Sequence, residues 1–143
     1  MNDKFYKKIS FKALKEELKL EARTVGEWET QPNGVKVKPL ISEEESNARN
    51  LTYIGLIFPV HTDAHYYKTQ VDSILFQNRC GIAFYEKVKG DYLMNFSSFN
   101  HGDAISIPSY VIRKIIPDEK KPSEIELIVQ PKFNPADEVH VFD

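Results

Sequence analysis

GLIFPVHTDAH, Gly55 to His65, and GDAISIPSYVIRK, Gly102 to Lys114, are the two stretches that decide the fold. Each begins at a glycine and continues into a short run rich in β-branched or aromatic residues, a pattern typical of strands joined by tight turns. Each also carries polar side chains within or beside that run. Together they predict a small antiparallel barrel with a polar patch inside it.

Outward from these stretches, short strand candidates follow one another with turn signals between most of them. Lys89-Gly90-Asp91 and Lys121-Pro122-Ser123 are two such turns. Many short strands with no helix between them indicate an antiparallel sandwich or barrel rather than alternating parallel units. The predicted strands are Leu51 to Val60, Ser73 to Gln77, Gly81 to Tyr85, Asp91 to Phe96, Ala104 to Ile107, Val111 to Ile116 and Ile125 to Val129, and Pro131 to Asp143 is predicted to be a surface tail.

The N-terminal part has a different pattern. Apolar residues from Phe11 to Ala22 recur at near-helical spacing after Ser10, a potential cap, which predicts one α-helix packed outside the β core. Gln31 to Gly34 reads as a turn that leads into a strand of alternating valines and lysines. We therefore divide the chain into a helical extension, residues 1–24, and a β domain, residues 25–143.

Composition limits the classes of partner. The chain has 143 residues and a formal net charge of −2, so it lacks the basic excess that nucleic acids or anionic membranes attract. The single cysteine, Cys80, has no partner for an internal disulfide, and the start MNDKFYKK lacks the apolar core of a signal peptide. We expect a cytoplasmic protein with a small-molecule ligand and no nucleic-acid or membrane partner.

The same two stretches resemble the cupin superfamily, whose members are RmlC-like jelly-roll barrels with a metal or ligand inside. Gly55 and His61 match the first cupin motif, Asp63 stands at its second histidine, and Asp72 is one candidate for its glutamate. The likeness covers roughly Trp28 to Val129. In the second motif Gly102 and Pro108 match, whereas Tyr110 and Arg113 replace the glycine and the metal-binding histidine.

This resemblance implies a single jelly-roll barrel that binds a small molecule. It also implies a divalent metal, iron, zinc, manganese or nickel, although loss of the second-motif histidine is equally compatible with no cofactor. Because cupins commonly pair through their sheets, the resemblance further implies a homodimer.

Residue spacing alone suggests where a metal would bind. On an extended strand His61, Asp63 and His65 point to one face, and two histidines with a carboxylate are the ligands of an open iron or zinc site. A further ligand must come from another strand, for which Asp72 and His101 are the candidates. The alternative is a polar strand end whose histidines are solvated or bonded to backbone.

Arg113 is the other informative position. Val111, Arg113 and Ile115 share one strand face, and if that face points inward the guanidinium needs Asp63, Asp72 or an anionic ligand as its partner. If the opposite face points inward, Arg113 is exposed. The sequence leaves both registers open.

Three functions remain open. The first is a cupin-like module that binds a small, anionic molecule through Arg113, Tyr110 and His61, with a degenerate or absent metal site. The second is a metal-dependent enzyme of the dioxygenase or sugar isomerase and epimerase class, with His61, Asp63, His65 and Asp72 around the metal. The third is a structural module that dimerises through the helix and edge strands.

Overall fold

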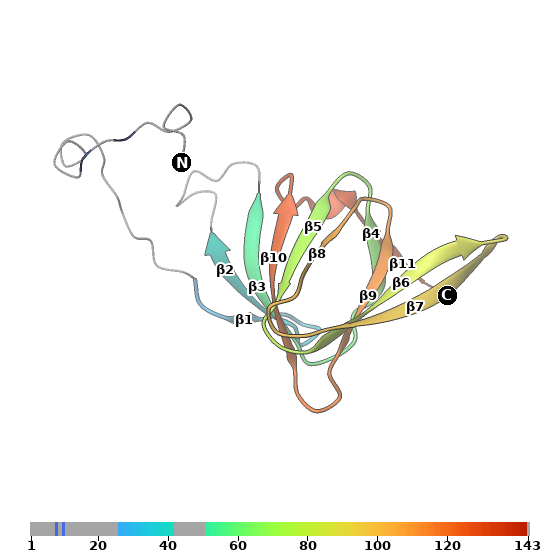
Figure 1. The fold of residues 1–143 in the computed structure, drawn as a ribbon, viewed down its shortest axis with the longest axis horizontal. Helices are drawn as coiled ribbons and strands as arrows, with labels where there is room; N and C mark the ends of the chain where they lie inside the picture. The colour runs from blue at the N-terminus through green and yellow to red at the C-terminus, as the bar shows by residue number, and fades with distance from the viewer. Residues whose placement is uncertain (1–7, 9, 11–25, 42–50, 143) are drawn as a thin grey trace.

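The computed structural model describes residues 8, 10, 26–41 and 51–142, and the strands among them form two antiparallel sheets facing each other (Figure 1). One sheet has the strand order β1-β2-β3-β10-β5-β8 and the other β11-β4-β9-β6-β7. The strands are β1 Glu29–Thr30, β2 Lys36–Ile41, β3 Thr52–Phe58, β4 Ala64–Tyr67, β5 Val71–Phe76, β6 Cys80–Val88, β7 Asp91–Phe99, β8 Ala104–Ile107, β9 Ile112–Pro117, β10 Ser123–Gln130 and β11 Glu138–Val141.

The strands from β3 to β10 follow jelly-roll order. β3, β10, β5 and β8 are neighbours in one sheet, and β4, β9, β6 and β7 are neighbours in the other. This arrangement of eight strands in two sheets is that of a jelly roll. The predicted mainly-β, jelly-roll architecture is therefore confirmed.

The predicted closed barrel needs correction. Among the described residues, no strand of the six-stranded sheet pairs through backbone hydrogen bonds with a strand of the five-stranded sheet. The sheets are instead joined by side chains that pack between their inner faces, as in a sandwich. Such packing joins two layers without continuing the backbone ladder around them.

The strand predictions are largely confirmed, and β8 has the predicted bounds. The tail prediction was wrong in part, because residues Glu138–Val141 form strand β11 and pair with β4. β4 itself was predicted only as an extended continuation of the preceding strand. Both strands have four residues, too few for a clear period-two pattern.

The predicted N-terminal helix lies outside the described residues, apart from its cap Ser10, which belongs to no regular element. Most of the predicted extension, residues 1–24, lies outside them for the same reason. No helix in the part of the chain that the structure describes has the length and apolarity of a membrane-spanning segment.

The core lies between the two sheets. Its fully buried members include Phe76, Ile82 and Ile125, and the Phe76 ring stacks on Phe99 with ring centroids 4.6 Å apart. Alternation along β10 sends Ile125, Leu127 and Val129 inward. This packing is the main source of stability, because burial of apolar area dominates folding.

Two motif glycines have structural reasons. A Cβ atom on Gly55 would lie 3.2 Å from the Trp28 ring, so a larger residue would push that ring away. Gly102 has a φ of +88°, which only glycine adopts without strain. Its N–H donates to the carbonyl of Phe76 and fixes the turn before β8.

We predict that Phe76→Ala lowers the free energy of unfolding by about 3–5 kcal/mol, because it removes a buried ring from a close-packed core. The matched control is Leu75→Ala at the next residue, which is 39% exposed and should cost less than about 1 kcal/mol. Urea unfolding followed by fluorescence measures both variants. Equal losses would contradict the assignment of Phe76 to the core.

Candidate functional site

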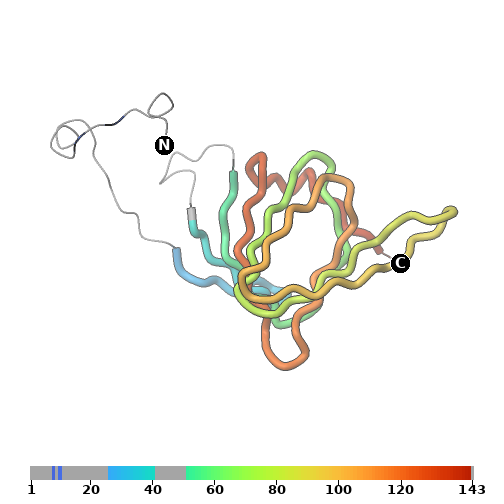
Figure 2. The backbone as a smooth tube through the Cα atoms, in the orientation of Figure 1, coloured from blue at the N-terminus to red at the C-terminus, as the bar shows by residue number. Residues whose placement is uncertain are grey.

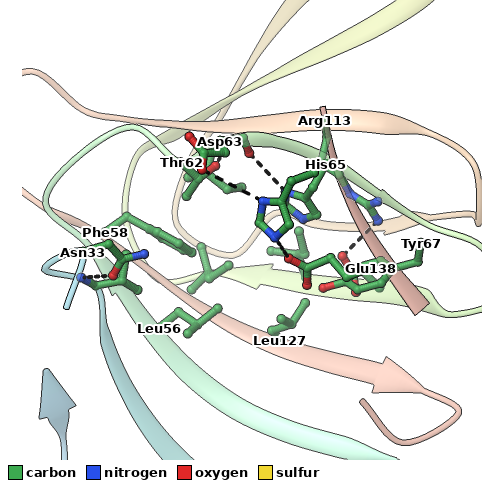
Figure 3. Close-up of a pocket in the computed structure, with 16 residues that line it drawn as sticks. Asn33, Leu56, Phe58, Thr62, Asp63, His65, Tyr67, Arg113, Leu127 and Glu138 are labelled. Carbon is green, nitrogen blue, oxygen red and sulfur yellow. Dashed lines mark hydrogen bonds and ion pairs between the residues drawn. The ribbon is translucent and has the colours of Figure 1, made fainter. Parts of the chain in front are cut away.

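A cavity of about 210 Å³ lies between the sheets (Figure 3). The two walls differ in chemistry. The six-stranded sheet and the segment leading into it contribute mainly apolar side chains, whereas the five-stranded sheet contributes most of the polar ones. The apolar wall includes Val35, Leu56, Phe58, Ile74, Ile125 and Leu127, and the opposite wall includes His65, Tyr67, Arg113, Ile115, Glu138 and His140.

A buried ion pair joins the two walls. Arg113 on β9 and Asp72 on β5 belong to different sheets, and the Arg113 Nη2 atom lies 2.9 Å from Asp72 Oδ2. The Arg113 side chain is 1% exposed, so its strand face points inward. Its Nη1 atom donates to the carbonyl of Val111 at 3.1 Å. Of the two registers that the sequence left open, the structure therefore has the one with Arg113 inside.

Burial dominates the electrostatics of this pair. It raises the pKa of Asp72 to about 6, although the Arg113 charge opposes that shift. Burial also lowers the pKa of Arg113, which the Asp72 charge opposes. The pair is therefore a buried charge pair near neutral pH, and Asp72 takes up a proton in mildly acidic solution.

Tyr67 completes the polar floor. Its ring lies beneath the guanidinium of Arg113, 4.9 Å from the Arg113 Cζ atom to the ring centroid. Burial raises the pKa of the Tyr67 phenol, and the charges of Asp72 and Glu138 raise it further. The hydroxyl is thus neutral and able to donate a hydrogen bond.

His65 is the histidine that the fold brings into the cavity. It pairs with Arg113 across β4 and β9, and burial lowers its pKa, so the ring is neutral at neutral pH. His65 Nδ1 lies 3.2 Å from the carbonyl oxygen of Asp63. Because a carbonyl only accepts, Nδ1 carries the proton and Nε2 is left as an acceptor.

The rim of the cavity comes from β11, which the sequence did not predict. Glu138 Oε1 contacts His140 Nε2, and His140 Nδ1 lies 4.0 Å from Asp63 Oδ2. Val139 and Val141 alternate with these polar residues, but four residues are too few for that alternation to identify a strand. Asp137, just before the strand, anchors it by accepting hydrogen bonds from the backbone N–H groups of Thr69 and Gln70.

The remaining predicted site residues are dispersed. His61 is exposed and does not line the cavity, because β4 begins only at Ala64 and the strand alternation does not reach back to residue 61. Asp63 lies at the rim with a side chain 69% exposed. Tyr110 is 66% exposed and stacks on Tyr66 with ring centroids 5.6 Å apart.

The backbone conformation of Tyr110 explains why the cupin motif has a glycine at this position. Tyr110 has a φ of +63°, the left-handed conformation that favours glycine, which is the residue the cupin motif has there.

A resident metal of the kind found in many cupins does not fit these residues. Within residues 26–41 and 51–142, no three His, Cys, Asp or Glu side chains are grouped so as to hold one metal ion. His61 is outside the cavity, and Asp72 is paired with Arg113, whose positive charge would repel a cation. We therefore derive no chemistry through a metal.

Similar folds occur among solved structures. Streptomyces Pac13, a nucleoside dehydratase, superposes with a TM-score of 0.58 at 16% identity over 86% of this chain and 92% of its own. Oxalate decarboxylase from Bacillus subtilis gives a TM-score of 0.62 at 14% identity over 85% of this chain and 34% of its own.

Peruvianin-I, described as a cysteine peptidase from Thevetia peruviana latex, gives a TM-score of 0.60 at 14% identity over 79% of this chain and 70% of its own. No family model and no curated protein matches the sequence. The chain therefore has a cupin-like fold. Because these neighbours differ in activity, the fold leaves the function to be argued from the site.

The site can form hydrogen bonds to a ligand without further groups. His65 Nε2 accepts a hydrogen bond, the Tyr67 phenol donates one, and the contacting side chains of Glu138 and His140 add polar groups at the rim. The apolar wall excludes water from one side and strengthens these interactions.

We predict that stability falls as pH rises from about 4 to about 6, because folded Asp72 has a pKa of about 6 against an ordinary value of 3.8. Between these values the folded protein holds a proton that the unfolded chain has lost. The resulting fall in the contribution of Asp72 to the free energy of unfolding is on the order of 3 kcal/mol. It is measured as the difference in unfolding free energy between wild type and Asp72→Asn. A difference that stays constant across this window would contradict the raised pKa.

Proposed function

We propose that this cupin-like protein binds a small, uncharged, hydroxyl-bearing molecule in the cavity between its sheets. The observation that carries the proposal is the buried Arg113–Asp72 pair that lines this cavity, in which Arg113 Nε and Asp72 Oδ1 have no hydrogen-bond partner. One is a donor and the other an acceptor, and leaving such atoms unpaired costs free energy. A ligand hydroxyl both donates and accepts, so it suits this pair.

The charges at the site favour a neutral ligand over the anion expected from the sequence. Asp72 already compensates Arg113, and the carboxylates of Glu138 and Asp63 add negative charge at the rim. An anion entering at neutral pH would meet this negative rim and find the guanidinium occupied. An anion was expected from the sequence because of Arg113, whereas Glu138 reaches the rim only through the folding of β11.

The size of the cavity and its apolar wall narrow the class of ligand further. A cavity of about 210 Å³ is smaller than the roughly 300–1,000 Å³ of pockets for drug-sized ligands. Leu56 and Leu127 offer contact to a carbon skeleton opposite the polar wall (Figure 3). These features together suit a sugar or the sugar part of a nucleoside.

One structural neighbour is consistent with this class. Streptomyces Pac13 has been crystallised with uridine, an uncharged molecule that carries hydroxyl groups. The likeness is one of fold, so uridine serves here as a probe of the ligand class.

Isothermal titration calorimetry with uridine and D-ribose at pH 7.5 tests the proposal, and we expect at least one of them to bind. Leu127→Phe fills the cavity without altering any charge and should weaken binding at least about tenfold. The matched control is Ile128→Phe, the next residue on β10, which lines a different pocket and should bind normally. Binding of neither probe, or equal binding by both variants, would contradict the proposal.

A second prediction concerns anions. Below pH 6 Asp72 is protonated and no longer neutralises Arg113, so formate should bind about tenfold more tightly at pH 5 than at pH 7.5. Calorimetric titration with sodium formate measures this change. In Asp72→Asn the affinity should vary little with pH, and a wild-type affinity that is also independent of pH would rule out the role given to Asp72.

A further inference from the structure

The β6–β7 hairpin extends beyond the rest of the five-stranded sheet (Figures 1 and 2). β7 is an edge strand of nine residues, and among the described residues it pairs only with β6. Alternate residues along its free edge therefore present N–H and C=O groups with no strand partner. Such an edge is a template for another strand.

The exposed side chains of this strand are apolar. Tyr92, Leu93, Met94 and Phe96 are each more than half exposed. Because alternate residues point to opposite faces, Tyr92, Met94 and Phe96 lie on one face and Leu93 on the other. The apolar surface thus covers both faces of the strand.

Edge strands in natural proteins are usually protected by charge, proline or shortness. β7 has none of these protections, since its sequence DYLMNFSSF contains no proline and its only charge is Asp91 at one end. Each of its large exposed residues leaves on the order of 100 Å² accessible, so the four together leave roughly 400 Å². That is about half of the roughly 800 Å² that one partner contributes to a standard interface.

The apolar row continues across the sheet. Tyr85 is paired with Met94 on one side and with Ile112 on the other. Tyr85 and Ile112 line a second surface cavity together with Tyr92 and Lys114. A partner strand added to β7 would cover the outer end of this row. The surface available there is therefore larger than β7 alone provides.

We propose that β7 pairs antiparallel with β7 of a second copy of this chain, about a two-fold axis at Met94. In this register Tyr92 lies opposite Phe96 of the second copy, and Leu93 lies opposite Asn95. Asp91 lies opposite Ser97, so no like charges meet. Aromatic side chains thus pair twice, and both faces of the strand are covered.

A second copy fits this strand for a physical reason. A strand with one terminal charge offers no charge complementarity to a polar partner, whereas it is complementary to itself under two-fold symmetry, the commonest symmetry of soluble oligomers. The pairing would join the two five-stranded sheets into one continuous sheet. The proposal is independent of the ligand proposed for the cavity.

Sedimentation equilibrium of the full chain tests the proposal, and we expect a dimer at micromolar concentration. Met94→Lys places two ammonium groups opposite each other at the axis and should convert the dimer to a monomer. Leu75→Lys puts the same charge at an exposed position on the other sheet and should leave the dimer intact. A monomeric wild type, or a dimer that Met94→Lys leaves unchanged, would overturn the proposal.

A cysteine at the two-fold axis provides a test that does not depend on disrupting the dimer. Met94→Cys should form an intermolecular disulfide on mild oxidation, because each Met94 faces its own copy, whereas Leu75→Cys should not. Cys80 does not interfere, since it is fully buried and burial raises its pKa to about 11. A monomeric Met94→Cys protein would overturn the pairing, and maleimide labelling would then show whether another part of the chain covers this strand.

Discussion

The Arg113–Asp72 ion pair is the interaction on which the arrangement of the site depends. It joins β9 of one sheet to β5 of the other at the floor of the cavity, where both side chains are almost fully buried. Loss of one partner from a buried pair costs about 3–5 kcal/mol, although an apolar pair of the same shape can be equally stable. The pair is therefore weak evidence that the fold gains stability from it. It is stronger evidence that the polar groups of this cavity serve a function. The pair goes with the inward register of β9, in which Ile115 is buried on the same strand face as Arg113, and the Tyr67 ring of β4 lies against the guanidinium.

Sequence reasoning predicted the jelly-roll fold because its signals are local. Turn residues and short β-branched runs predict the bounds of most strands to within a few residues, and they predict both bounds of β8 correctly. It could not decide between a closed barrel and an open sandwich, because that depends on which edge strands pair across the molecule. It also missed β11, whose four residues follow a turn that contains Pro135. The predicted helix lies outside the residues that the structure describes, apart from its cap Ser10.

The site was predicted in part for a similar reason. Arg113, Asp72 and His65 were selected from the sequence, and all three line the cavity. His61 was selected by extending strand alternation too far, since a loop precedes Ala64 and changes the direction of its side chain. Glu138 reaches the site only because β11 pairs with β4 from some seventy residues away in the chain. Contacts between residues so far apart in the chain leave no signal in the local sequence pattern, so the negative charge that Glu138 adds to the rim could not be predicted.

The separation of the cavity into an apolar wall and a polar wall has an evolutionary consequence. The apolar wall shares strands with the main core, so substitutions there are constrained by folding. Most of the polar wall comes from β4, β9 and β11, where side chains such as His65 and Glu138 can change with less effect on that core. New ligand preferences can therefore arise on one sheet while the other preserves the scaffold. A mutant library restricted to His65, Glu138 and His140 would sample this freedom with few unfolded members.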